Sequence, residues 1–131
     1  MRRLLLGTNV LVRHLTHDHP KHSRRATALL ASPERFLLTD VVFAETVYVL
    51  QSVYRAPPPC VAQVMRAALG HPTLEVERPA RLLRAVEVYE QYRVDFADAY
   101  LVAVAEESKA GAIASFDRSL DRVPTVERVE P

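Results

Sequence analysis

Short apolar runs alternate along the chain with longer stretches in which apolar residues recur every three or four positions. Three brief runs end at turn or helix-start residues and predict buried strands, a fourth segment alternates like a strand, and the tail is expected to add an edge strand. These segments are Leu4–Leu6, Phe36–Leu38, Ala112–Ser115, Leu74–Val76 and Val126–Val129. Strands separated by helices are typical of a parallel sheet covered on both faces. The pattern therefore predicts a single α/β domain over residues 1–131, with a parallel sheet of four to five strands.

Residues that favour helix starts and breaks define the predicted helices. Thr8 or Asn9 is expected to cap the helix after the first strand, and Thr39 begins a helix-start signal after the second. The three prolines Pro57–Pro59 predict a break, because proline cannot sit inside a helix. A further helix is predicted from there, over residues 60–69.

Composition narrows the class of protein. The chain has 131 residues, 49% of them hydrophobic, with 17 basic against 16 acidic side chains. This balance argues against a protein that holds long DNA by a general basic surface, although a few local arginines could still contact phosphates. Cys60 is the only cysteine, which excludes an intramolecular disulfide and a cysteine-based zinc site. No stretch approaches the roughly 18 apolar residues of a membrane span, so a cytoplasmic protein is expected.

Three acids occupy positions where α/β proteins bind ligands, beyond the carboxyl ends of strands. Asp117 follows the Ala112–Ser115 strand, Glu45 lies in the second turn of the helix after the second strand, and Asp98 opens an apolar helix. If they converge at one sheet edge, a hard divalent cation would offset their repulsion. Alternatively, Asp98 is a helix-start residue and Asp117 a turn residue. Asp95, three residues before Asp98, suits the capping role better.

Glu45 stands out because its helical neighbours Val41, Tyr48 and Val49 are apolar. A carboxylate buried on such a face is costly unless something pairs with it. Alternatively, the helix is rotated so that Glu45 reaches solvent at the edge of the stripe.

Four segments resemble the motifs of PIN domains, and especially of VapC toxins. They read Gly-Thr-Asn-Val-Leu-Val-Arg from Gly7, Phe-Ala-Glu-Thr-Val-Tyr-Val-Leu from Phe43, Asp-Phe-Ala-Asp-Ala-Tyr-Leu from Asp95 and Ser-Phe-Asp-Arg from Ser115. The family has, in the same order, Asp-Thr-Asn-Val-Leu-Val-Arg after a strand, a glutamate in an apolar helix, Asp-Ala at the head of a helix and Thr/Ser-Phe-Asp-Arg after a strand. The order and spacing agree across nearly the whole chain.

The resemblance implies a three-layer α/β/α fold and a Mg²⁺- or Mn²⁺-dependent endoribonuclease. It implies that Glu45, Asp98 and Asp117 are the catalytic, metal-binding residues. The supporting residues would be Thr8, Asn9, Asp95 and Ser115, and the candidate phosphate contacts Arg13 and Arg118. VapC-type proteins pair with themselves and with a VapB-type antitoxin, so a homodimer and an antitoxin partner are expected beside the RNA substrate. The apolar side chains of Tyr48, Val49 and Val53 would serve such a partner or, alternatively, the chain's own core.

Gly7 departs from the family, which has its first aspartate at this position. Loss of this acid is expected to weaken or abolish cleavage, since even a supporting residue of a metal site typically contributes about 10–100-fold. The alternative is a disabled PIN-fold module that binds a partner protein or RNA without cleaving. A flavodoxin-like signalling domain is disfavoured, because receiver domains need paired acids where this chain has Leu6-Gly7-Thr8.

Histidines and basic residues gather between residues 14 and 25. His14, His17, His19 and His22 suggest a zinc site, but Pro20 interrupts the chain and a solvated loop is the favoured interpretation. Lys21, Arg24 and Arg25 form a small basic cluster that either helps to hold RNA or is an exposed helix face.

Overall fold

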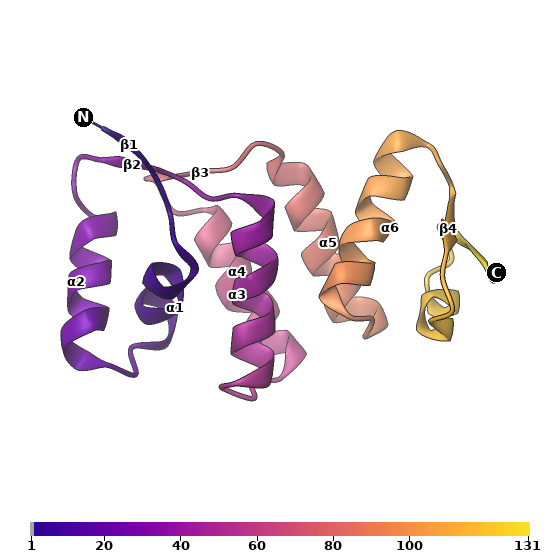
Figure 1. The fold of residues 1–131 in the computed structure, drawn as a ribbon, viewed down its shortest axis with the longest axis horizontal. Coiled ribbons are helices and arrows are strands. Elements are labelled where there is room, and N and C mark those ends of the chain that lie inside the picture. Colours follow the sequence, from indigo (N-terminus) through magenta and orange to yellow (C-terminus); the bar gives the residue numbers. More distant parts are fainter. Residues whose placement is uncertain (1) are drawn as a thin grey trace. The chain divides into compact units, whose positions relative to one another are not determined.

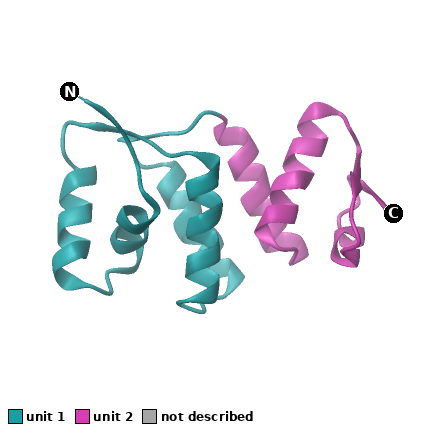
Figure 2. Cartoon of the chain, in the orientation of Figure 1, with its two compact units in different colours: residues 1–77 teal, residues 78–131 magenta. Residues whose placement is uncertain are grey.

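The structure is a computed structural model that describes residues 2–131. The chain divides into two compact units (Figure 2), one ending at Glu77 and the other comprising Arg78–Pro131. Each unit contains its own parallel strands and helices. No helix of the described residues has the length and apolar character needed to cross a membrane.

The first unit contains a three-stranded parallel sheet and four helices (Figure 1). Its elements are β1 (Arg3–Leu5), α1 (Thr8–Thr16), α2 (Pro20–Leu30), β2 (Arg35–Leu37), α3 (Asp40–Ser52), α4 (Pro58–Leu69) and β3 (Leu74–Glu75). The strand order is β1-β2-β3, and Phe36 at the centre aligns with Leu4 on one side and Leu74 on the other. Helix α1 packs against both α2 and α3, and α3 packs against α4.

The second unit pairs two helices and two short parallel strands. Its elements are α5 (Pro79–Tyr92), α6 (Phe96–Ser108), β4 (Ala112–Ala114), the short 3₁₀ helix η1 (Arg118–Arg122) and β5 (Glu127–Val129). Helix α5 packs along α6 through buried side chains such as Leu82, Val86 and Val102. Strand β4 pairs with β5 so that Ile113 aligns with Arg128.

The five strands confirm the predicted α/β class, and each begins within one residue of its predicted position. Their hydrogen bonds divide them into a sheet of three and a sheet of two. Leu6, Phe36, Leu38 and Ile113 are buried, as predicted for these apolar runs. The prediction that the strands are buried along their whole length is wrong for β1 and β4, because Leu5 is 74% exposed and Ala112 and Ala114 are also exposed.

Two helix starts differ from the sequence prediction. Gly7, and not Thr8 or Asn9, is the N-cap of α1, so this helix begins without a side-chain cap. Helix α4 begins at Pro58 inside the proline run, because the first helical positions need no backbone N–H donor and tolerate proline. By contrast, Thr39 caps α3 as predicted, and its hydroxyl accepts a hydrogen bond from the Val42 N–H at 3.2 Å.

Candidate functional site

Gly7 links β1 to α1 and does not need to be glycine for backbone reasons. Its φ of −84° and ψ of 152° are extended values that any residue adopts. A Cβ at this position would meet only the Asn9 Oδ1 atom, at 3.5 Å, which is an ordinary van der Waals contact. The local structure therefore accommodates an aspartate at position 7.

Glu45 faces solvent, so the expectation of a buried carboxylate is wrong. Its neighbours on the same stripe, Val41 and Tyr48, are 76% and 67% exposed. The face of α3 that packs into the core is a different one, formed by Phe43, Thr46, Val47 and Leu50. The helix is rotated as in the alternative interpretation, and Glu45 needs no buried partner.

A hollow of about 500 Å³ lies beside Glu45 in the first unit. Its lining comes from α1, from α3 and from the segment after α3: Thr8, Asn9, Val12, Arg13, Glu45, Val49, Val53 and Tyr54. The family motif at the start of α1 and the motif glutamate of α3 therefore meet at one cavity.

Asp18 holds Arg13 at the edge of this hollow. The Asp18 carboxylate accepts hydrogen bonds from Arg13 Nη1 at 3.0 Å, Thr16 Oγ1 at 2.9 Å and the Tyr54 hydroxyl at 2.5 Å. The Tyr54 bond is the largest of the causes that lower the pKa of Asp18 to about 2. Sequence reasoning missed Asp18 and Tyr54, because nothing in the spacing of positions 13, 18 and 54 predicts that they meet.

In the second unit, Asp98 and Asp117 form a carboxyl pair. Asp98 lies in the first turn of α6 and Asp117 follows β4, and the two side chains share a hydrogen bond. Burial, followed by the proximity of Asp117, raises the pKa of Asp98. Hydrogen bonds from the hydroxyl and backbone N–H of Ser119 lower the pKa of Asp117. Asp98 is therefore the more readily protonated member of the pair.

Ser115 and Asp95 are near this pair in the sequence, two residues before Asp117 and three residues before Asp98. The Ser115 hydroxyl accepts a hydrogen bond from the Asp117 N–H at 3.0 Å and so fixes the turn after β4. Asp95 is the N-cap residue of α6, as expected, but its side chain makes no capping hydrogen bond. Its negative charge contributes to the raised pKa of Asp98. Asp117 also caps η1, because its side chain accepts a hydrogen bond from the Ser119 N–H, which is the turn role of the alternative interpretation.

The oxygen donors suit a hard divalent cation. Mg²⁺ prefers oxygen ligands and often uses only one or two carboxylates, which matches the Asp98–Asp117 pair in the second unit. In the first unit, Glu45 shares its hollow with the oxygen-bearing side chains of Thr8 and Asn9. Within residues 2–131, no set of three or more Asp, Glu, His or Cys side chains is arranged to hold a metal ion. The convergence of all three acids at one edge stays a prediction.

The two candidate phosphate contacts differ in their surroundings. Arg13 is paired with Asp18, whereas the Arg118 side chain is 80% exposed, with its Nε 3.9 Å from a Glu130 carboxylate oxygen. Both roles remain predictions.

Short parallel strands separated by helices define an α/β protein. The model of the PIN domain family matches residues 4–126, and the chain belongs to this family. Family membership agrees with the three-layer α/β/α fold that the sequence implied. The match spans both units and includes all four motifs.

Two solved structures are similar to this chain at low identity. One is VapBC2 from Rickettsia felis bound to a DNA fragment from its promoter, with 18% identity over 99% of this chain and 98% of that chain, and a TM-score of 0.39. The other is VapC20 from Mycobacterium tuberculosis, a Sarcin-Ricin loop cleaving toxin, with 18% identity over 95% of this chain and 97% of that chain, and a TM-score of 0.43. A comparison with curated proteins gave no match.

Proposed function

We propose that this chain is a metal-dependent endoribonuclease of the VapC toxin type whose activity is weakened by Gly7. The observation that carries the proposal is the Asp98–Asp117 carboxyl pair, which joins the third and fourth family motifs in a chain that belongs to the PIN-domain family. In this proposal residues 1–131 act as one PIN domain, in the cytoplasm, with RNA as the substrate.

Glu45, Asp98 and Asp117 are the proposed ligands of a Mg²⁺ or Mn²⁺ ion. When bound, the cation supplies charge stabilisation at the phosphate and makes water a better nucleophile. Because the pKa of Asp98 is raised, first by burial and then by Asp117, protons compete with the cation for this carboxylate more than for Asp117. The Ser119 N–H, 2.9 Å from Asp117 Oδ1, keeps this carboxylate oriented and charged while that happens.

The other motif residues orient the site and contact the substrate. Thr8 and Asn9 line the hollow beside Glu45, and Ser115 fixes the turn that carries Asp117. Asp95 adds negative charge near Asp98, which strengthens the attraction for a cation. Arg13 and Arg118 are the proposed phosphate contacts.

An RNA cleavage assay tests this function. The chain and its Gly7→Asp variant are incubated with single-stranded RNA and Mn²⁺ or Mg²⁺, with EDTA as the metal-free control. We expect the aspartate to raise metal-dependent cleavage by at least about tenfold, and Asp117→Asn to remove that gain. Cleavage that persists in EDTA, or no gain from the aspartate, would contradict the proposal.

The second candidate is a module that binds without cleaving, and Gly7 favours it because the first motif lacks its acid. Three apolar side chains of the first unit, Val41, Tyr48 and Val53, are between 67% and 76% exposed, which suits contact with another protein. The proposed partners are a VapB-type antitoxin and a second copy of this chain. RNA or antitoxin binding by the chain, with no cleavage even in the Gly7→Asp variant, would favour this candidate.

A further inference from the structure

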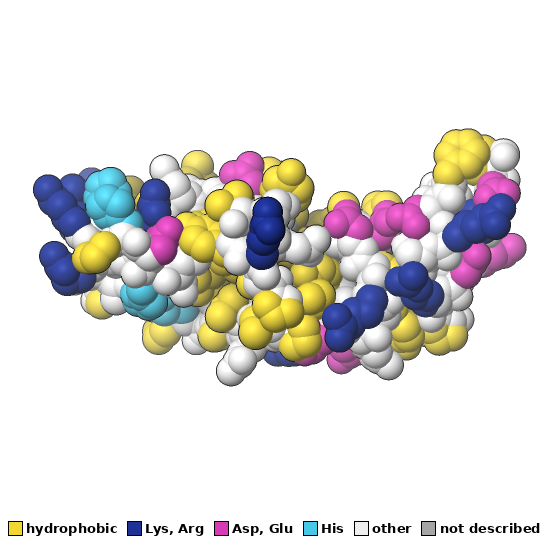
Figure 3. All heavy atoms as spheres, turned by 90° about the horizontal axis from the view of Figure 1, so that it is seen from below, with side chains coloured by type: hydrophobic (Ala, Val, Ile, Leu, Met, Phe, Trp, Pro, Cys, Tyr) yellow, Lys and Arg dark blue, Asp and Glu magenta, His cyan; other side chains and the backbone are white. Residues whose placement is uncertain are grey.

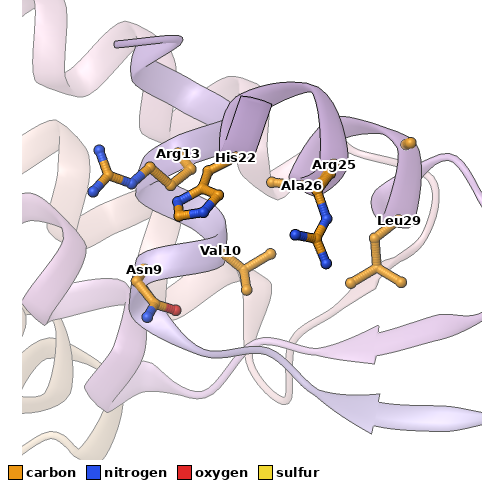
Figure 4. A pocket seen from close by; sticks show the side chains of 8 residues that line it. Asn9, Val10, Arg13, His22, Arg25, Ala26 and Leu29 are labelled. Carbon is orange, nitrogen blue, oxygen red and sulfur yellow. The ribbon is translucent and has the colours of Figure 1, made fainter. Parts of the chain in front are cut away.

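A hollow of about 780 Å³ lies between α1 and α2 in the first unit. From α1 it is lined by Asn9, Val10 and Arg13. The α2 residues that line it are spaced mostly three and four apart and so lie on one side of that helix: His22, Arg25, Ala26, Ala28 and Leu29. Figure 4 shows the labelled side chains of the two helices around the same space.

This hollow is positively charged. Arg25 is exposed and makes no ion pair within residues 2–131, and none of the described residues that line the hollow is acidic. The pKa of His22 is lowered first by neighbouring His19, then by burial, and then by the charges of Arg13 and Arg25. The positive groups around His22 therefore make a further positive charge unfavourable there. Basic and histidine side chains are gathered over this part of the first unit, on the left of Figure 3. Such a field attracts anions.

The hollow also offers apolar and flat surfaces. Val10, Ala26 and the partly exposed Leu29 supply aliphatic surface. The His22 ring stacks on His19 with 4.0 Å between the ring centroids and 16° between the ring planes. Single-stranded nucleic acid combines backbone phosphates with flat bases that stack on such side chains, and proteins bind it with positive grooves and aromatic rings.

Asn9 and Arg13 line this hollow and also the hollow that contains Glu45. The two cavities are therefore neighbours along α1, and a strand held in one can continue into the other. We propose that the α1–α2 hollow binds the backbone of single-stranded RNA next to the site of cleavage, with Arg25 as its principal phosphate contact. This inference rests on the proposed ribonuclease function for the identity of the nucleic acid.

Binding without metal tests the inference separately from cleavage. The anisotropy of a short fluorescein-labelled single-stranded RNA is measured in EDTA between about 50 and 200 mM salt. Arg25→Ala should weaken binding roughly three- to tenfold and make the salt dependence shallower by about 0.7 in log K against log salt, the value for one phosphate contact. Arg25→Lys should retain most of the salt dependence, because it keeps the charge.

Arg24→Ala is the matched control. Arg24 is an exposed arginine on the same helix, but it does not line the hollow, so its removal should change the affinity by no more than about twofold. Equal effects of the two alanine variants would overturn the inference. It would also be overturned if the RNA failed to bind while an acidic peptide bound in an Arg25-dependent way.

The outcomes separate this inference from the proposed function. Arg25-dependent RNA binding, with no metal-dependent cleavage by the Gly7→Asp variant, supports the RNA-binding hollow and contradicts the nuclease. Metal-dependent cleavage combined with RNA binding that is insensitive to Arg25 supports the nuclease and contradicts the RNA-binding hollow.

Discussion

The Asp98 carboxyl group shares a hydrogen bond with the carboxyl group of Asp117, one from the first turn of α6 and the other from the turn after β4. The pKa shifts of the two groups run in opposite directions, because Asp98 is the more buried and Asp117 accepts hydrogen bonds from Ser119. Two neighbouring carboxylates repel each other when both are charged, and either a proton on Asp98 or a bound cation relieves this repulsion. The pair is thus a place where a divalent ion and a proton compete.

This competition predicts the effect of Mn²⁺ on stability. At a Mn²⁺ concentration about 100 times its Kd, a bound ion adds about 2.7 kcal/mol to the free energy of unfolding. Asp98→Asn and Asp117→Asn should each remove most of this increase, measured by urea unfolding with Mn²⁺ and with EDTA. Glu127→Gln, on the exposed start of β5, is the control and should keep it. Mn²⁺ stabilisation that is unchanged in both asparagine variants would show that the ion binds elsewhere.

Replacement of Gly7 by aspartate should stabilise the metal-free protein. Gly7 is the N-cap of α1 without a capping side chain, and a new Cβ has room there. An aspartate would accept a hydrogen bond from the first turn and interact favourably with the helix dipole, together worth a few tenths to about 1 kcal/mol. Urea unfolding in EDTA measures this. Gly7→Asn should show only the part of this stabilisation that comes from the capping hydrogen bond, because asparagine is uncharged. Gly7→Ala cannot cap the helix and should be less stable than the parent chain.

The strand positions and the place of Asp117 after β4 could be predicted because they depend on local signals. Short apolar runs define strands by themselves, and an acid directly after a strand must lie at the carboxyl end of the sheet. The orientation of Glu45 could not be predicted in this way, since several faces of the apolar helix α3 could have packed inward. The core uses the face of Phe43 and Leu50, which leaves Tyr48 in solvent.

The polar networks were also beyond the sequence. Arg13 and Asp18 are five residues apart, and the hydrogen bond between them depends on the turn after α1 and on the Tyr54 hydroxyl, which also bonds to Asp18. The Arg84–Glu106 pair likewise depends on how α5 lies along α6. Ser119 could have been found, because a serine two residues after an aspartate commonly donates its N–H to that side chain in a turn.

Arg84 should stabilise the second unit through its two parallel hydrogen bonds to Glu106, at 2.8 and 2.9 Å. Both side chains are less than one-third exposed, so the pair is screened less than a fully exposed ion pair. Arg84→Lys keeps the charge but loses the fork geometry, and should lower the free energy of unfolding by about 0.5–1.5 kcal/mol. Arg78→Lys, at a 60% exposed side chain paired with Glu107, should change it much less. If Arg84→Lys and Arg78→Lys lowered the free energy of unfolding equally, the paired hydrogen bonds between Arg84 and Glu106 would contribute nothing beyond the charge.

Tyr54→Phe should raise the pKa of Asp18. The Tyr54 hydroxyl is the largest single cause that keeps this pKa at about 2, and the bonds from Thr16 and Arg13 remain in the variant. The pKa should therefore increase but stay below its ordinary value. Carboxyl NMR resonances followed during an acid titration measure it, with Tyr48→Phe on the exposed stripe of α3 as the control. An unchanged Asp18 pKa in Tyr54→Phe would contradict the hydrogen-bond network.

His14 makes the stability of the first unit depend on pH. Its Nδ1 lies 2.9 Å from Thr27 Oγ1, and burial, followed by the neighbouring rings of His71 and His17, lowers its pKa below 6.5. As the pH falls, the unfolded chain takes up its proton before the folded chain does. The contribution of His14 is therefore fully present above its unfolded pKa and is lost as the pH falls through its lower folded pKa.

The free energy of unfolding, measured with urea, should accordingly decrease as the pH is lowered from about 8 to about 5. His14→Gln should make this decrease smaller. Part of it should remain, because His22 also has a lowered pKa, caused first by His19. Imidazole NMR signals identify the contribution of each ring, since the His14 signal should titrate below the value of an unperturbed histidine. A His14 ring that titrates at or above that value would mean that burial and the neighbouring rings of His71 and His17 do not resist its protonation, and the part of the loss assigned to His14 would not occur.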